Sequence, residues 1–352
     1  MDLNVAVLGA TGAVGMELLS LLEGGALPVA GLRCFASERS AGTSVPFRGG
    51  TVPVENAERA DFAGIDVAFF SAGAERSRRY GPRAAAAGAV VIDNSSAFRM
   101  DPDVPLVVPE INAEALAGHR GIVANPNCTT IVALMAVAPL HREAGARSLR
   151  VASYQAASGA GARAMAELKE QTSAILAGRP AKAAVFPSPL AFNVIPHIGH
   201  FLPDGSTEEE RKLRDESRKI LSLPGLSVSA ICVRVPVLRS HCVACWLGTE
   251  RPLSAARARE VLAAAEGVKV VDDPGALAYP MPVLATGEGP VIVGRIRVDE
   301  ADGAGVSFFV AGDQLLKGAA LNAVQIAEAL LARGLFPRPA GPEHGRGSSG
   351  GH

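Results

Sequence analysis

The sequence predicts an α/β protein with a doubly wound parallel sheet in its first domain and a second, α+β domain with a mixed or antiparallel sheet. Two observations support the first domain. Short apolar runs alternate with helical segments in the first third of the chain, and a glycine-rich turn follows the first run directly. A third observation indicates the second domain, because several strand-like segments follow residue 226 with few helices between them.

The first domain is expected over residues 1–128. The apolar run at 3–8 predicts a buried strand, and the small residues after it predict a turn into a helix over 13–23. An alanine-rich segment predicts a second helix at 75–87. Further apolar runs predict strands at 31–36, 66–71, 89–93 and 105–108.

The second domain is expected over residues 129–316. The apolar and charged patterns predict helices at 129–143, 162–177 and 207–222, and strands at 147–155, 227–237, 241–249, 291–298 and 305–312. The segment 180–205, rich in Pro, His and Phe, predicts an extended connection. A last helix at 317–334 is expected to complete the first domain, and the low-complexity residues 336–352 are expected to be a disordered tail.

The composition excludes several classes of protein. A formal net charge of −1 gives no electrostatic basis for binding nucleic acid or an anionic membrane. No apolar stretch is long enough to span a bilayer, and the first residues lack the pattern of a signal peptide. Five cysteines in a chain of 352 residues are an odd number and too few for a disulfide scaffold, so a reducing compartment is favoured. We therefore expect a cytoplasmic protein.

A dinucleotide site is predicted at the turn after the first strand, where residues 9–15 are GATGAVG. Gly9, Gly12 and Gly15 would let the backbone approach a pyrophosphate at the start of the helix, where Thr11, Ala13 and Val14 also lie. The spacing differs from the common G-x-G-x-x-G, and a turn kept only for packing is the alternative. The turn and its position favour phosphate binding.

The end of the second strand predicts which dinucleotide binds. Ser37, Arg39 and Ser40 offer two hydroxyls and a guanidinium to a ribose 2′-phosphate, which favours NADP. Glu38 is a contrary observation, because an acidic residue here is typical of NAD binding. The alternative for Arg39 is an ordinary exposed arginine.

Cys128 is the candidate nucleophile. It follows an Asn-Pro-Asn turn that includes Asn127 and precedes an apolar helix, so it is expected at a helix N-terminus, where unpaired N–H groups lower a thiol pKa. Asn127 and these N–H groups could bind an oxyanion. A buried structural cysteine is the alternative. Cys242 and Cys245 have a C-x-x-C spacing but lie in a predicted strand, so we expect no metal site.

A base and a substrate clamp are harder to identify from the residues. Arg234 could hold a carboxylate in a bidentate contact, or it could be a surface arginine on an edge strand. His241 could act as a base, although other histidines are available: His119, His141, His197 and His200. Glu209 and Lys212 share a helix face, but the spacing of Ser206 and Glu209 equally predicts a capping box.

These stretches together resemble the aspartate-semialdehyde dehydrogenase family over roughly residues 3–334. The matching segments are 9–15, Ser71–Gly73, Asp93–Arg99, Val108–Asn112, Asn125–Thr130, Tyr154–Gly161, Glu209–Lys212, Arg234–His241 and Lys317–Asn322. Two features depart from the family pattern. The tail at 336–352 is not usual in it, and the Thr-Thr pair after Cys128 is shared with glyceraldehyde-phosphate dehydrogenases.

The resemblance implies an NADPH-dependent reductive dephosphorylation of L-β-aspartyl phosphate to L-aspartate β-semialdehyde, reversible and with release of phosphate, by a homodimer. It implies that Cys128 forms a thioester, that His241 is the acid/base, and that Gln155 orients the intermediate. Arg234 would hold the α-carboxylate and Glu209 the α-ammonium. The implied phosphate pocket contains Arg99 and Lys212, with Asn94 as a possible helper. The implied cofactor site adds Ser71, Asn94, Ser158, Gly159, Gly161 and Asn322.

Two alternatives remain open. An N-acetyl-glutamyl-phosphate reductase would share the fold, the cofactor and the cysteine, but an N-acetyl group would give Glu209 no charge to pair with. A non-catalytic nucleotide-sensing protein could use the same scaffold. The joint presence of Cys128, Gln155, Arg234 and His241 argues against it.

Overall fold

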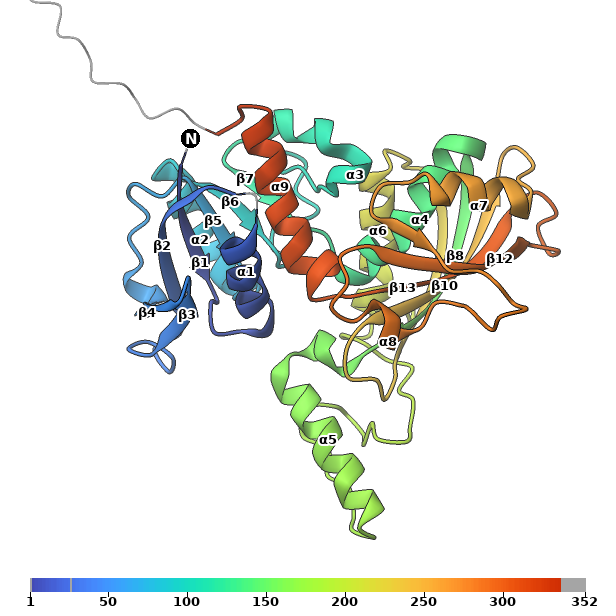
Figure 1. The fold of residues 1–352 in the computed structure, drawn as a ribbon, viewed down its shortest axis with the longest axis horizontal. Coiled ribbons are helices and arrows are strands. Elements are labelled where there is room, and N and C mark those ends of the chain that lie inside the picture. Colours follow the sequence, from blue (N-terminus) through green and yellow to red (C-terminus); the bar gives the residue numbers. More distant parts are fainter. Residues whose placement is uncertain (1, 26, 337–352) are drawn as a thin grey trace, which may run out of the picture.

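The computed structural model describes residues 2–25 and 27–336. It has an N-terminal sheet and a C-terminal sheet, which lie side by side (Figure 1). The predicted disordered tail lies, apart from Phe336, outside the described residues. Among the described helices, none combines the length and the apolar character needed to cross a membrane.

The N-terminal sheet has seven strands in the order β3-β4-β2-β1-β5-β6-β7. Its central strands β1, β2, β5, β6 and β7 are parallel, β4 is parallel to β2, and β3 pairs antiparallel with β4. The bounds are β1 (Leu3–Leu8), β2 (Val29–Ala36), β3 (Ser44–Phe47), β4 (Gly50–Asn56), β5 (Val67–Phe70), β6 (Val90–Asp93) and β7 (Ile122–Ala124). Every residue of β5 and β6 is buried, as expected for strands covered on both faces.

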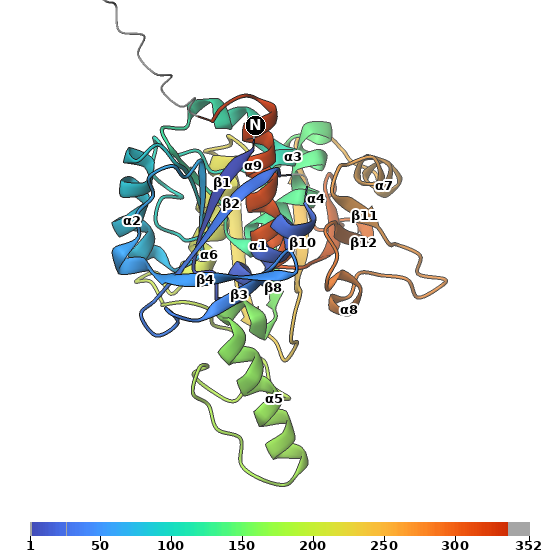
Figure 2. The same cartoon turned by 60° about the vertical axis from the view of Figure 1, so that its left-hand side comes forward.

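Helices cover both faces of this sheet. On one face, α1 (Ala13–Gly24) and α9 (Leu321–Ala332) pack Leu18 and Ile326 into a core with Val5 and Val7. On the other face, α2 (Ala74–Ala86) forms a second core around the buried ring of Tyr80. Figure 2 shows α2 and α9 on opposite sides of β1 and β2. Helix α9 comes from the far end of the chain and completes this layer.

The C-terminal sheet has six strands in the order β11-β12-β13-β10-β8-β9. It is mixed, because β8 pairs parallel with β9 and antiparallel with β10, while β12 and β13 are antiparallel. The bounds are β8 (Ala146–Gln155), β9 (Ser227–Arg234), β10 (His241–Thr249), β11 (Val268–Val270), β12 (Val291–Val298) and β13 (Val306–Gly312). The two sheets confirm the predicted fold class.

Three helices cover one face of the C-terminal sheet: α4 (Cys128–Ala144), α6 (Glu208–Ile220) and α7 (Ala255–Ala263). Helix α4 is apolar on all sides and almost wholly buried from Thr129 to Leu140, which is typical of a helix in the middle of a protein. It begins directly after β7, so its N-terminus lies where the two domains meet. The short elements are η1 (Ala57–Arg59), α3 (Pro109–Asn112), η2 (Ala113–Gly118), η3 (Ala157–Ala160) and α8 (Pro282–Ala285).

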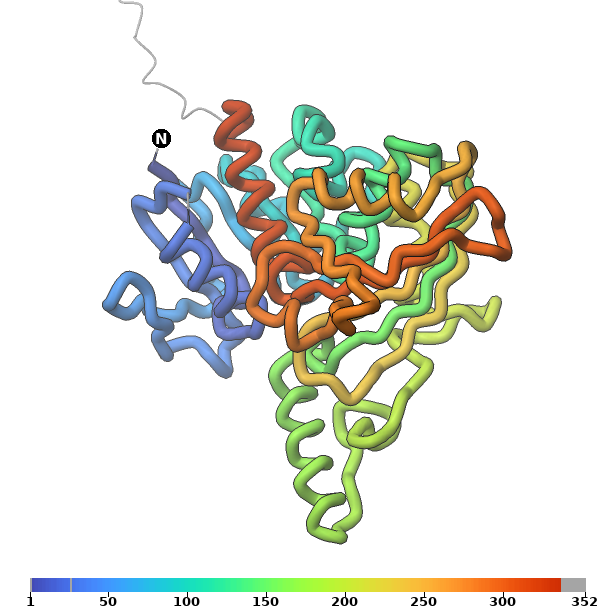
Figure 3. Tube along the Cα trace, turned by 45° about the vertical axis from the view of Figure 1, so that its right-hand side comes forward, coloured from blue at the N-terminus to red at the C-terminus, as the bar shows by residue number. Residues whose placement is uncertain are grey.

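Helix α5 (Ala162–Leu176) projects away from both sheets as an arm (Figures 1 and 3). The predicted extended connection returns alongside it. Glu167 of α5 accepts hydrogen bonds from the amides of Ala184 and Val185, and Gln171 accepts them from Leu190 and Ala191. Two buried polar side chains therefore hold the returning chain to the helix.

Some elements differ from the sequence prediction. Residues 105–108 form no strand, since only Leu106 bridges to Ala124. Strands β3, β4, β7 and β11 were not predicted. The last helix is interrupted at its start, because Leu316–Ala320 (η4) is a π-helical turn that precedes α9. The capping box of α6 is formed by Thr207 and Glu210, one residue later than predicted.

Candidate active site

Two adjoining cavities lie over the carboxyl ends of β1, β2, β5 and β6. One of about 280 Å³ is lined by Cys128 together with Gly12, Ala13, Val14, Ser71 and Asn94. The other, of about 560 Å³, is lined by Gly9, Thr11, Ser37, Arg39 and Ser40. Gly12 and Ser71 line both, so the two form one trough. This edge of an open parallel sheet is where dinucleotides bind.

The glycine turn is fixed by close backbone packing. Gly9 has φ +96°, and a Cβ on it would lie 2.4 Å from the carbonyl oxygen of Ser71. A Cβ on Gly15 would lie 2.2 Å from the carbonyl oxygen of Gly9, so Gly15 supports the turn and does not line either cavity. Gly12 is the N-cap of α1, and no side chain among the described residues caps this helix. Its free N–H groups can therefore bind a phosphate.

The outer end of the trough carries two cations. Arg39 and Ser40 lie there as predicted, and Arg76 of α2 joins them. None of the described residues that line this cavity is acidic. Glu38 lies outside it and is exposed. Sequence reasoning missed Arg76, although its place in the first turn of a helix after Ser71–Gly73 is a recognisable position. Two guanidiniums and hydroxyls suit a phosphate monoester.

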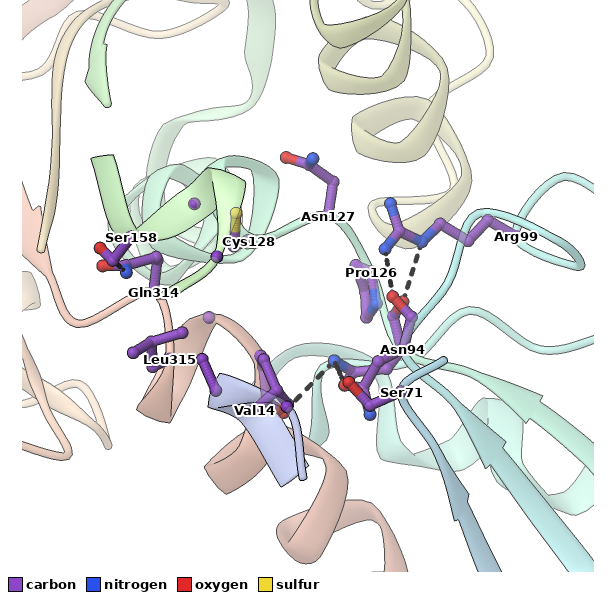
Figure 4. Close-up of a pocket in the computed structure, with 17 residues that line it drawn as sticks. Val14, Ser71, Asn94, Arg99, Pro126, Asn127, Cys128, Ser158, Gln314 and Leu315 are labelled. Carbon is purple, nitrogen blue, oxygen red and sulfur yellow. Dashed lines mark hydrogen bonds between the residues drawn. The ribbon is translucent and has the colours of Figure 1, made fainter. Parts of the chain in front are cut away.

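Cys128 is the first residue of α4, as predicted. Asn127 is the N-cap, and its Oδ1 accepts hydrogen bonds from the amides of Thr129 at 2.9 Å and Thr130 at 3.1 Å. Behind the thiol, a Cβ on Gly318 would lie 2.9 Å from Cβ of Cys128, so only glycine fits there. Figure 4 shows the sulfur between Arg99 and Asn94 on one side and Ser158 and Gln314 on the other.

The pKa of Cys128 is raised, whereas the sequence predicted a lowered one. Burial, and then the carboxylate of Glu209, raise the pKa of the Cys128 thiol to about 11 against the opposing charges of Arg99 and Arg234. The helix N-terminus lies where it was predicted, but burial and the nearby carboxylate outweigh it. Without a ligand, the group is a thiol.

Glu209 faces the site because the capping box of α6 uses its neighbours. Thr207 and Glu210 exchange the two cap bonds, which leaves the buried Glu209 free to accept from Asn127 Nδ2 at 2.9 Å, Gln155 Nε2 at 3.3 Å and Lys212 Nζ at 3.3 Å. Burial alone would raise the pKa of Glu209, but Lys212 and these donors hold it below its usual value. The predicted Glu209, Lys212, Asn127 and Gln155 are thus brought together.

Arg99 is buried beside the smaller cavity that Cys128 also lines. Its Nε donates to the carbonyl oxygen of Asn125 at 3.0 Å and its Nη2 to that of Asn94 at 2.8 Å (Figure 4). Its Nη1 donates to Glu216 of α6 at 3.0 Å. The guanidinium lines the smaller cavity, so it can meet an anion near the thiol.

Arg234 and His241 meet at the end of β8. Nη1 of Arg234 donates to the carbonyl oxygen of Ala156 at 2.6 Å, and Nδ1 of His241 accepts from the amide of Ala156 at 3.1 Å. Nε2 of His241 finds no partner among the described residues. A Cβ on Gly159 would lie 2.9 Å from both Nε2 of His241 and Nη1 of Arg234, so only glycine lets them approach the cavity that Gly159 lines.

His241 is therefore held neutral in one tautomer. Burial first, and then the charge of Arg234, keep the pKa of His241 well below its usual value. Because Nδ1 accepts a hydrogen bond, the proton of the neutral ring is on Nε2. This nitrogen can donate a hydrogen bond toward the cavity.

Two loops close the smaller cavity. Ser158, Gly159 and Gly161 line it from the turn after β8, as predicted. Gln314, Leu315, Gly318 and Ala319 line it from the segment around η4, and sequence reasoning assigned none of these four. Nε2 of Gln314 is hydrogen-bonded to Oγ of Ser158, which ties the loops together.

Asn322 does not reach either cavity. It is fully buried and donates to Oδ1 of Asn125 at 2.6 Å and to the carbonyl oxygen of Val107 at 3.0 Å, so it acts through Asn125, which lines the smaller cavity.

Within the described part of the chain, no group of His, Cys, Asp and Glu side chains is arranged to hold a metal ion. Cys242 and Cys245 are buried, unpaired thiols on β10.

Comparison with known proteins gives one consistent result. Residues 4–119 match the family of the semialdehyde dehydrogenase NAD binding domain, and residues 137–317 match that of the semialdehyde dehydrogenase dimerisation domain. The aspartate-semialdehyde dehydrogenase of Synechocystis sp. is 49% identical over 94% of this chain and 98% of its own. That of Aquifex aeolicus is 49% identical over 96% of this chain and 100% of its own.

Solved structures agree with the sequences. Aspartate semialdehyde dehydrogenase II from Vibrio cholerae, complexed with ASA, superposes with a TM-score of 0.92 at 43% identity, over 94% of this chain and 99% of its own. The aspartate semialdehyde dehydrogenase with NADP from Candida albicans has a TM-score of 0.75 at 25% identity, over 95% of this chain and 100% of its own.

Proposed function

The chain belongs to the aspartate-semialdehyde dehydrogenase family, and from this premise we propose that it makes L-aspartate β-semialdehyde through a thioester on Cys128. The reaction is the reductive dephosphorylation of L-β-aspartyl phosphate, an oxidoreductase step in the synthesis of lysine, threonine, methionine and isoleucine. One observation carries the assignment of the nucleophile. Cys128 begins a helix in the same trough as the glycine turn.

The chemistry follows from this position. The Cys128 sulfur attacks the acyl carbon, the new C–S bond forms, the C–O bond to phosphate breaks, and the thiol proton leaves with the departing phosphate. Bound NADPH would supply a hydride to the thioester carbon. The resulting oxyanion then collapses to the aldehyde, and the C–S bond returns its electrons to sulfur. The N–H of Cys128 and the second N–H of the Asn127 side-chain amide can stabilise the oxyanion, since Asn127 already binds the amides of Thr129 and Thr130.

Each charged group of the proposed substrate can be paired with a side chain of opposite charge in the site. We assign the α-ammonium to the buried carboxylate of Glu209 and the α-carboxylate to Arg234. The phosphate is assigned to Arg99 and Lys212, with Asn94 beside them. Gln155 donates to Glu209, so it can orient the substrate through that carboxylate. An N-acetylated substrate would leave the charge of Glu209 unpaired.

We assign His241 the acid–base role, acting at Nε2. This nitrogen lies beside Gly159, which lines the smaller cavity, and Nδ1 is already engaged by the amide of Ala156. A donor at Nε2 can stabilise the oxygen that gains negative charge during attack and hydride transfer.

The dinucleotide is proposed to be NADP. The NAD binding family match and the uncapped start of α1 support a pyrophosphate at Gly12. Arg39 and Ser40, with Arg76 beside them, would then hold the 2′-phosphate. Ser71, Ser158 and Gly161 would border the nicotinamide end near Cys128.

The working enzyme is a homodimer, and we propose that the open face of the C-terminal sheet forms its interface. The match to a dimerisation domain covers this sheet. One face is covered by α4, α6 and α7. On the other face, the ring centroids of Tyr154 and Phe309 are 5.9 Å apart, and Ile231 is 60% exposed. A mass of one chain in analytical ultracentrifugation would contradict the dimer, and Ile231→Arg should separate the subunits.

We also propose a cytoplasmic location. All five cysteines are unpaired thiols, as expected in a reducing compartment.

The decisive test is an assay in the reverse direction. Aspartate semialdehyde, phosphate and NADP⁺ should give NADPH, which is followed by its absorbance. NAD⁺ should be a poorer substrate. Activity on N-acetyl-glutamate semialdehyde with none on aspartate semialdehyde would contradict the proposed substrate. NADPH binding with no turnover of either would favour a nucleotide sensor.

A further inference from the structure

Helix α6 presents four charged side chains of alternating sign to the site: Glu209, Lys212, Glu216 and Lys219. Their spacing of three, four and three residues places them on one helix face. The proposed function uses the first two. Glu216 and Lys219 contact the same site but have no role in binding the substrate.

Glu216 joins two parts of the site. Its side chain is only 1% exposed, Oε1 accepts from Nη1 of Arg99 at 3.0 Å, and Oε2 accepts from the amide of Asn127 at 2.6 Å. Burial raises the pKa of Glu216, while the charge of Arg99 and the hydrogen bond from the amide of Asn127 favour its carboxylate form. Asn127 directly precedes Cys128. One carboxylate therefore spans from the arginine of the phosphate pocket to the backbone next to the nucleophile.

The contacts of Arg99 leave part of the guanidinium free for a ligand. Three of its five N–H groups donate to Asn125, Asn94 and Glu216. One N–H on each terminal nitrogen has no acceptor among residues 2–25 and 27–336. Lys219 fixes the backbone of the same residue, because its Nζ binds the carbonyl oxygens of Arg99, Asp101 and Val104 at 2.7–2.8 Å.

We propose that Glu216 is a positioning residue that sets the distance between the phosphate-binding guanidinium of Arg99 and the nucleophile Cys128. An acyl phosphate must place its phosphate on Arg99 while its carbon meets the sulfur, so this distance must match the substrate. The inference rests on the proposed function, since it takes Arg99 as the phosphate ligand.

The arrangement also has an electrostatic consequence. The carboxylate of Glu216 balances the charge of Arg99, which is one of the groups that lower the pKa of Cys128. Removing the charge of Glu216 but keeping its length leaves Arg99 uncompensated beside the thiol. Shortening the side chain but keeping its charge leaves Arg99 compensated and changes only the distance that the side chain spans. Two variants can therefore separate distance from charge.

The test compares Glu216→Asp and Glu216→Gln with Asp215→Asn, a control that removes a carboxylate paired with Arg214 one residue away. Steady-state rates are measured with aspartate semialdehyde, phosphate and NADP⁺. The pH dependence of Cys128 alkylation by iodoacetamide is measured without substrate. NADP⁺ affinity and the unfolding midpoint show whether each variant is folded.

Glu216→Asp cannot reach both donors, so kcat should fall about tenfold or more and KM for phosphate should rise severalfold. KM for aspartate semialdehyde should stay within about twofold, because Arg234 and Glu209 hold the amino-acid end. Its alkylation profile should not move. Glu216→Gln should also lose kcat, since an amide cannot accept both bonds, but its alkylation profile should shift to lower pH. Asp215→Asn should match the unaltered enzyme.

Two results would overturn the inference. One is that both Glu216 variants keep the kcat and the phosphate KM of the unaltered enzyme. The other is that the variants lose activity only as far as their unfolding midpoint falls or they fail to fold, and that the alkylation profile of Glu216→Gln does not shift. Either would make Glu216 an ordinary buried ion pair. An unaltered enzyme without activity would instead contradict the proposed function, while the alkylation profiles would still test the link to Cys128.

Discussion

Replacement of Arg39 by alanine should weaken the use of NADP⁺ far more than that of NAD⁺. The side chain lies at the outer end of the trough with Ser37, Ser40 and Arg76, well away from Cys128. The two cofactors differ there only by the 2′-phosphate. A contact with this phosphate is therefore lost for NADP⁺ and never existed for NAD⁺.

The size of the effect follows from the exposure of Arg39. A hydrogen bond to a charged group contributes about 1.5–3 kcal/mol, and solvent screening reduces this for an exposed side chain. We expect a loss of about 1–2 kcal/mol, which corresponds to a five- to thirtyfold lower kcat/KM with NADP⁺. With NAD⁺ the change should be less than about twofold. Arg76 remains and limits the loss.

The assay is the reverse reaction with each cofactor at low and high salt. Arg76→Ala is the matched comparison, because it removes the other cation of the same cavity. The double variant should lose more NADP⁺ activity than either single one, and high salt should reduce all the differences. An equal loss with both cofactors in Arg39→Ala would mean that Arg39 does not contact the 2′-phosphate.

Three further predictions concern the reacting end. Cys128→Ala should abolish turnover and leave NADPH binding, measured by fluorescence, unchanged; measurable turnover would refute the thioester. Arg234→Lys should lower kcat/KM for aspartate semialdehyde about tenfold or more, because an ammonium cannot form a paired carboxylate contact; unchanged kinetics would remove Arg234 from the substrate clamp. Since the pKa of Cys128 is raised to about 11, alkylation of the free enzyme should rise with pH from 7 to 10 without a plateau. In Glu209→Gln it should be faster at each pH while turnover falls, and a slower rate would contradict the role of Glu209 in raising that pKa.

The parts of the site that depend on neighbouring residues could be predicted from the sequence. The glycine turn and Cys128 each lie between a strand and a helix, and both are where the sequence placed them. In these places the local pattern decides the backbone, because a helix N-terminus exposes its N–H groups whatever packs around it.

Residues that join the site through tertiary contacts could not be found in this way. Arg76, Glu216 and Gln314 lie on separate elements, and only tertiary packing brings Arg76 to the outer end of the trough and Glu216 and Gln314 to the region around Cys128. Strands β3 and β4 were missed for a local reason. Pro46 and Pro53 interrupt their pattern, and proline is tolerated there because this antiparallel pair lies at the sheet edge.

The cap of α6 shows how one residue of register changes a functional interpretation. Ser206 and Glu209 have the spacing of a capping box, which would have used the carboxylate in the helix itself. Thr207 and Glu210 form the box instead. Glu209 lies about 100° away from Glu210 around the helix axis, and its carboxylate therefore accepts from Asn127. Spacing alone cannot choose between two adjacent boxes, since both fit the same motif.

The raised pKa of Cys128 is consistent with a nucleophile that works through the charges of its ligands. Burial and Glu209 hold the sulfur as a thiol in the free protein, while Arg99 and Arg234 favour the thiolate. In the proposed assignment, a bound α-ammonium would cancel the charge of Glu209 and so remove a cause that opposes ionisation. A thiol that ionises only beside its substrate is protected from alkylation and oxidation in the free enzyme. Glu209 would thus link the proposed recognition of the amino acid to activation of the nucleophile.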